Sequence, residues 1–164
     1  MASVSPFHPG EQEIQTRLGM RDEIEDIGQR FIRDHLPEQH QEFYANLPYL
    51  VVGSVDDAGR PWASLLAGPP GFIASPDARR LSISTQPVFG DPLRDNLVAG
   101  VQLGFLGLDY AARRRNRLTG SLIRHDDQGM EIRVRQTFGN CPKYIQAREV
   151  VSGGAFGNDD EVHP

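Results

Sequence analysis

Apolar positions in the first part of the chain repeat at spacings of three and four residues, the period of an α-helix. Within the segment from Gly10 to Pro37 they fall at Ile14, Leu18, Met20, Ile24, Ile27 and Phe31. This pattern predicts an amphipathic helical arm that is interrupted near Gly19. A short second helix is expected to begin at Pro37 and to end before Pro48, because proline suits the first turn of a helix and stops a later one.

From Tyr49 onward the pattern changes to short apolar runs and alternation, which are typical of β-strands. Tyr49 to Val55 and Pro61 to Leu66 flank a turn and predict a hairpin. A second hairpin is expected from Asn116 to Ile123 and from Met130 to Phe138, where apolar and charged residues alternate. The other expected elements are strands at 81–85 and 101–108, a short helix that opens at 91–92, and a last short helix after 142.

These elements predict a mainly β protein with peripheral helices. About six strands with turn-length connections are too many for an open sheet with long free edges, so closure into a small barrel is expected. We divide the chain into a helical arm (1–48), a barrel (49–151) and a flexible acidic tail (152–164), which is rich in Gly, Asp and Glu.

Composition excludes several classes of protein. The net charge of −5 over 164 residues gives no long-range attraction for nucleic acid or for an anionic membrane surface. Cys141 is the only cysteine, which excludes an internal disulfide and zinc sites that need two or more thiolates. The sequence contains neither a secretory signal pattern nor an apolar run long enough to span a membrane, so we expect a soluble, cytoplasmic protein.

The strongest catalytic motifs are missing from the sequence. It lacks the glycine-rich patterns of Rossmann and P-loop proteins, the G-x-S-x-G of α/β-hydrolases and the H-E-x-x-H of zinc proteases. His35 and His40 are five residues apart with Pro37 between them, so they do not share a helical face. We therefore expect no metal site.

Three features remain as candidates for chemistry. The run Arg113 to Arg117 contains four arginines, which suit either a solvated strand edge or a phosphate site, since a guanidinium matches two phosphate oxygens. Trp62 stands on a strand of small and apolar residues and is either core filler or the border of a flat aromatic ligand. Cys141 precedes a proline and has only Lys143 nearby to lower its pKa, so a nucleophilic role is disfavoured.

Three segments together resemble the pyridoxamine 5'-phosphate oxidase-like family of FMN-binding split barrels. They are Val51 to Asp56, Gly59 to Leu66 and Phe138 to Ile145, and the resemblance extends from about Phe7 to Glu149. The last segment and residues 90–97 are similar to one bacterial branch, in which this domain also occurs joined to a ferredoxin-reductase-like module.

The resemblance implies a six-stranded antiparallel split β-barrel that forms a homodimer and holds FMN between its subunits. It places the flavin ring along the second strand and implies roles for hydroxyl and amide groups at the ribityl chain and phosphate. Many members carry a lysine where this chain has Leu93, so the phosphate charge must come from Arg94 or from the arginine strand. The implied cofactor-binding residues are Trp62, Ala63, Ser64, Leu65, Ser82, Ser84, Thr85, Arg94, Asn96, Arg115 and Arg117.

The function implied by the resemblance is that of an FMN-dependent oxidoreductase with an unknown small-molecule substrate. Oxidation of pyridoxamine phosphate needs a C-terminal segment that this chain lacks, so that reaction is not carried over. Two alternatives remain open: a flavin-binding or electron-relay module without turnover, and a related barrel that binds haem or another planar ligand. No side chain is assigned as a catalytic acid or base.

Overall fold

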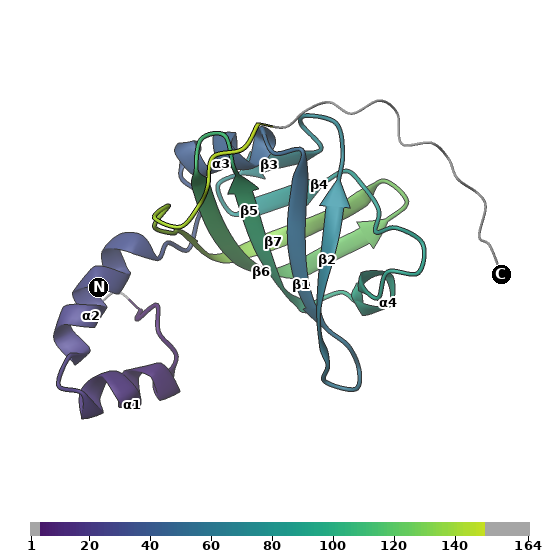
Figure 1. The fold of residues 1–164 in the computed structure, drawn as a ribbon. Coiled ribbons are helices and arrows are strands. Elements are labelled where there is room, and N and C mark those ends of the chain that lie inside the picture. Colours follow the sequence, from purple (N-terminus) through teal and green to yellow (C-terminus); the bar gives the residue numbers. More distant parts are fainter. Residues whose placement is uncertain (1–3, 150–164) are drawn as a thin grey trace.

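Seven antiparallel strands form one curved sheet in the order β2-β1-β5-β6-β7-β4-β3 (Figure 1). The structure is a computed structural model that describes residues 4–149. The strands are β1 (Tyr49–Val55), β2 (Pro61–Ala67), β3 (Ile73–Asp77), β4 (Arg80–Ile83), β5 (Gln102–Asp109), β6 (Arg114–Asp126) and β7 (Gly129–Gly139). The helices are α1 (Pro9–Arg17), α2 (Arg21–Phe31), α3 (Glu38–Ala45) and α4 (Leu93–Asn96).

Buried and more exposed residues alternate along the strands, and the buried ones form the core. Every second residue of β1, from Leu50 through Val52 to Ser54, is buried on the concave side of the sheet, and Leu66, Phe105 and Leu118 continue this layer on neighbouring strands. Helix α3 covers one end of the core with Phe43 and Tyr44. Its close approach to β5 depends on Gly107, because a Cβ there would lie 2.6 Å from the Phe43 ring.

The predicted fold class, mainly β with peripheral helices, is confirmed, and both predicted hairpins form. The sheet has seven strands where six were expected, because β3 adds an edge strand that pairs only with β4. The expected closure of the strands into a barrel is wrong: β2 and β3 lie at the two ends of the sheet and do not pair with each other, so the hydrogen-bonded ladder stays open. After Pro142 the chain forms a single turn, from Ile145 N–H to Pro142 C=O at 2.9 Å, in place of the expected helix.

Helices α1 and α2 form an arm that lies to one side of the sheet (Figure 1). The expected interruption is at Gly19, whose positive φ of 68° allows the chain to reverse between the two helices. An isolated β-bridge between Arg33 and Thr137 joins the arm to β7. Of the predicted divisions, the tail at 152–164 lies outside the described residues. Within residues 4–149, no helix is long and apolar enough to cross a membrane.

Candidate functional site

The convex outer face of β2, β1, β5 and β6 presents two neighbouring rows of residues, which the strand register brings into line. One row is bulky and mostly apolar, and the next is made of small side chains. The bulky row consists of Leu65, Val51, Leu106, Arg117 and Phe138. The small row consists of Ala63, Gly53, Gly104 and Thr119. The side chains of the bulky row extend further from the sheet than those of the small row, so a shallow groove runs across four strands.

This groove has a volume of about 360 Å³, and its lining includes Ala63, Gly53, Gly104 and Arg117. Neither glycine is required by the packing of the chain itself. Both have φ values that any residue can adopt, and an added Cβ would meet nothing within 4 Å at Gly104 and only Gly104 O, at 3.8 Å, at Gly53. Because glycine weakens a strand, two adjacent strand glycines with free space above them mark a place where a ligand or another backbone approaches closely.

Four of the residues expected to bind FMN lie on this outer face: Ala63, Leu65, Arg115 and Arg117. Leu65 is 55% exposed on β2, at one end of the bulky row, and Arg117 is exposed on β6, next to Phe138 at the other end. Three strand spacings separate these two residues, roughly 14 Å across the face. The Nε atom of Arg115 is buried and has no hydrogen-bond partner.

Two more of the expected residues, Ser64 and Asn96, are buried and hydrogen-bonded within the chain. Ser64 Oγ donates to Asp91 Oδ1 at 2.6 Å, and the same carboxylate oxygen accepts the Leu93 N–H at 2.8 Å. Asn96 Nδ2 donates to Ser54 Oγ at 3.0 Å. These contacts attach the short helix α4 to the inner side of β1 and β2.

Trp62 lies at the rim between β2 and α4 and is 39% exposed. Its indole N–H donates to Asp56 Oδ2 at 2.9 Å, and Arg60 Nε reaches the same oxygen at 2.7 Å. These hydrogen bonds lower the pKa of Asp56 to about 2, and the bond from Trp62 has the largest effect. A cavity of about 440 Å³ separates this group from Asp95 and Asn96 on α4.

The remaining expected residues come from β4 and the segment that follows it. Ser82 lies within β4, Ser84 is exposed just beyond its end, and Thr85 Oγ1 donates to Ala67 O at the end of β2 at 3.0 Å. Arg94 is exposed on α4 and donates to Pro87 O at 3.4 Å. The fold therefore brings the end of β4, α4 and the edge strand β2 to one side of the sheet, and it places Arg115 and Arg117 across the outer face.

Sequence reasoning missed three residues that shape this region: Gly53, Gly104 and Asp91. Both glycines stand inside strongly apolar strand patterns, Val-Val-Gly-Ser-Val and Leu-Gly-Phe-Leu, where a glycine is unfavourable unless space is needed. That signal was available in the sequence. Asp91 was expected only as a helix cap, and its second partner, Ser64, is 27 residues away in the chain.

Replacing Asp91 by alanine is expected to lower the free energy of unfolding by about 1–2 kcal/mol. The change removes the acceptor of the Leu93 N–H at the start of α4 and leaves the buried Ser64 hydroxyl without its acceptor. Urea denaturation of Asp91→Ala against the wild type measures this loss. Asp95→Ala is the matched control, because Asp95 is exposed on the same helix, and its effect should stay within about 0.5 kcal/mol. Equal losses in both variants would contradict the role assigned to Asp91.

Solved structures that are similar to this chain include two of the protein HupZ. No family model and no curated protein matches the chain. A crystal structure of HupZ from Group A Streptococcus has 15% sequence identity and a TM-score of 0.49, and the match covers 63% of this chain and 93% of that one. A histidine-to-alanine variant of HupZ gives 15% identity and a TM-score of 0.47, covering 64% of this chain and 99% of that one. These matches establish neither a family nor a ligand for this chain.

Proposed function

We propose that this protein is a homodimeric FMN-binding protein of the pyridoxamine 5'-phosphate oxidase-like type, and that it acts as an oxidoreductase on a small-molecule substrate. The observation that carries this proposal is the outer-face groove. Its floor lacks side chains at Gly53 and Gly104, although the chain itself has room for them. A flat ring system fits such a floor, and Ala63 and Leu65 border it on the strand where the sequence resemblance implies the flavin ring.

The arginines at the far end of the groove fit the phosphate of FMN. Arg117 lines the groove and forms no ion pair with any residue between 4 and 149. Arg115 has a buried Nε without an acceptor, which a phosphate oxygen would supply once the side chain turned outward. Guanidinium groups bind phosphate through paired hydrogen bonds, so these residues would hold that end of the cofactor.

The edge strand β2 offers the flavin ring a polar border. Strand β1 pairs along one side of β2, and no strand of the described residues pairs along the other. Its N–H and C=O groups on that side, from Trp62 to Leu66, match the alternating donors and acceptors at the rim of a flavin. FMN, when bound, supplies the electron transfer. The protein's own contribution is to hold and orient the ring and to exclude water from one of its faces.

A second copy of the chain would complete this site. The outer face exposes Leu65 and Val55, by 55% and 53%, next to Val51 and Leu106, so it forms an apolar surface on the outside of the barrel. Contiguous apolar surface of this kind is usually covered by a partner, and an isologous dimer covers the same patch on both copies. Each groove would then be closed by the other subunit, with FMN between the two.

The direct test is to load the purified protein with FMN and to measure its absorption spectrum and its mass by light scattering at micromolar concentration. We expect a flavin spectrum and one FMN per chain in a dimer. A stable monomer that retains FMN would contradict the dimer and the shared site, and a haem spectrum would contradict the cofactor. Reduction of bound FMN by NADH or NADPH, followed by turnover with an acceptor, distinguishes an oxidoreductase from an electron-relay module.

A further inference from the structure

A separate cavity of about 520 Å³ lies where the arm meets the barrel, and its size is that of a small-molecule site. Two helices, the segment between them and the end of β7 contribute to its wall. Arg30 and Phe31 come from the last turn of α2, Arg33 and Pro37 from the connecting segment, and His40 from α3. The end of β7 and Cys141 form the remaining side.

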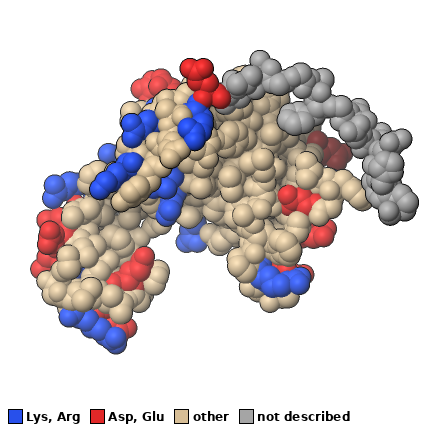
Figure 2. Space-filling model, in the orientation of Figure 1, with Lys and Arg blue, Asp and Glu red and all other residues tan. Residues whose placement is uncertain are grey.

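The charge of this cavity is positive and lacks a counter-charge. Its lining contains two arginines and no Asp or Glu, and a third arginine, Arg114, reaches the lining residue Gln39, with Nη2 3.5 Å from its carbonyl oxygen. Within residues 4–149, Arg30, Arg33 and Arg114 form no ion pair with a carboxylate. Figure 2 shows Lys and Arg side chains gathered on the surface between the arm and the barrel.

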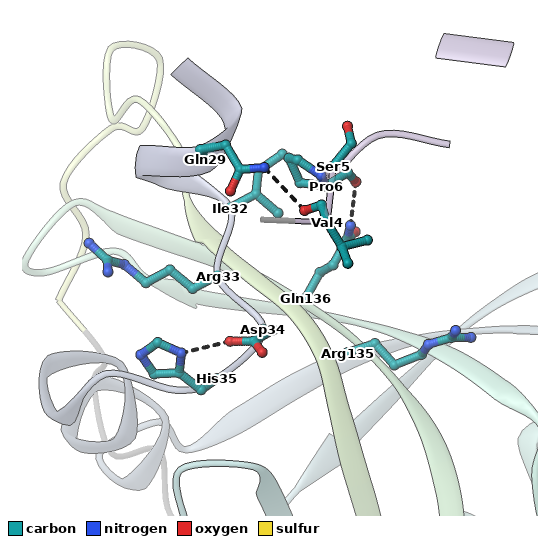
Figure 3. Close-up of a pocket in the computed structure, with 10 residues that line it drawn as sticks. All are labelled: Val4, Ser5, Pro6, Gln29, Ile32, Arg33, Asp34, His35, Arg135 and Gln136. Carbon is teal, nitrogen blue, oxygen red and sulfur yellow. Dashed lines mark hydrogen bonds and ion pairs between the residues drawn. The ribbon is translucent and has the colours of Figure 1, made fainter. Parts of the chain in front are cut away.

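The nearby cavity shown in Figure 3 differs because its lining contains a carboxylate as well as arginines. Its wall also contains Arg33, but it includes the carboxylate of Asp34, which accepts hydrogen bonds from His35 at 2.9 Å and from Arg79 at 2.8 Å. Gln136 also donates across it to Pro6 O at 2.6 Å. The polar groups of that cavity are therefore largely satisfied by the protein itself, whereas the arginines around His40 are not.

The position of Arg33 is fixed before any ligand arrives. Its backbone N–H donates to Thr137 O at 3.0 Å and its carbonyl accepts from Thr137 N–H at 2.8 Å, so the residue is attached to β7. A binding group whose backbone is already held loses less entropy when a ligand binds. The cavity thus has an arginine with a fixed backbone close to an exposed aromatic ring, that of Phe31, which is 66% exposed.

His40 adds a titratable polar group to the lining. Its Nδ1 lies 3.1 Å from Thr137 Oγ1, which is also 3.1 Å from Arg117 O. Burial lowers the pKa of His40, and the charges of Arg114 and Arg33 lower it further.

We propose that this cavity binds a small organic anion, whose phosphate or carboxylate group pairs with Arg30 and Arg33 and whose apolar part contacts Phe31 and Pro37. The ligand would join the end of α2 to the end of β7 and so attach the arm more firmly to the barrel. This site is distinct from the outer-face groove and does not depend on FMN.

Phenyl phosphate is a suitable probe, because it combines a phosphate with an apolar ring. Calorimetric titration at 0.15 M salt is expected to show saturable binding with one site per chain. Arg33→Gln should weaken binding roughly ten- to a hundredfold, since it removes charge-assisted hydrogen bonds while its backbone contacts remain. Arg133→Gln, an exposed arginine on β7 outside the cavity, is the matched control and should bind as the wild type does.

A second readout is the titration of His40 by NMR, with its signal assigned among the five histidines by comparison with His40→Gln. A bound anion offsets the charges of Arg30, Arg33 and Arg114, so the pKa of His40 should rise when phenyl phosphate saturates the site.

Any of four results would overturn the proposal. One is the absence of saturable binding, and a second is an equal loss in both arginine variants, which would indicate only a general effect of charge. Another is binding of inorganic phosphate as tight as that of phenyl phosphate, which would exclude the apolar contact. The last is displacement of phenyl phosphate by FMN at one FMN per chain, which would make the cavity part of the flavin site.

Discussion

Gly104→Leu is expected to give a folded monomer that no longer binds FMN. The leucine side chain would occupy the floor of the groove, where a Cβ meets no atom of its own chain within 4 Å, so the monomer has no reason to unfold. The same side chain would stand where the flavin and the second subunit are proposed to lie. Replacing a strand glycine also favours the extended backbone by roughly 0.5–1 kcal/mol, so the melting temperature should stay constant or rise.

Light scattering, flavin absorption after dialysis and a thermal melt together measure these three effects. Ala74→Leu is the control, since Ala74 is exposed on β3 at the far end of the sheet. It adds a leucine to the surface without touching the groove and should remain a dimer with FMN. If Gly104→Leu also remains dimeric and loaded with FMN, the outer face is not the site, and the proposal fails.

Arg117→Ala and Arg115→Ala are each expected to weaken FMN binding roughly ten- to a hundredfold, because each loses charge-assisted hydrogen bonds worth about 1.5–3 kcal/mol. Riboflavin lacks the phosphate, so its affinity should change far less. This difference between the two ligands, measured by fluorescence titration of each variant, separates a phosphate contact from a general loss of stability.

Arg94→Ala provides the opposing case in the same experiment. Arg94 is exposed on α4, which packs against the inner side of β1 and β2, away from the outer face that carries Arg115 and Arg117. Among residues 4–149 its guanidinium donates only to the Pro87 carbonyl. If Arg94→Ala alone discriminates between FMN and riboflavin, the phosphate lies at the short helix and the assignment to β6 is wrong. Equal and small changes in FMN and riboflavin affinity in all three variants would indicate that these arginines are solvated surface residues.

The hairpins were predictable because their signal is local. In β6 and β7 the alternation of apolar and charged residues fixes both the strand period and the buried face, and the turn between them follows directly. Strand β3 was missed for an equally physical reason. It contains Pro76, which argues against a central strand, but β3 is an edge strand, where a missing N–H costs little.

The candidate site was harder to predict than the fold. A strand pattern shows which residues share a face, so Ala63 and Leu65 could be placed together from the sequence. It does not show which polar side chains find partners inside the chain. Ser64 and Asn96 are hydrogen-bonded to Asp91 and Ser54, each at least 27 residues away, and such pairings depend on how α4 packs against the sheet.

The bridge between Arg33 and Thr137 has a consequence during protein synthesis. The ribosome completes the arm early, but the strand that anchors it, β7, is among the last described elements to emerge. Until then the arm can rely only on its own contacts. Ser5 donates to Glu25 at 2.7 Å and Gln12 to Phe7 O at 2.7 Å, and the ring of Phe7 covers Gly28, so these are the contacts open to the two helices before β7 is made.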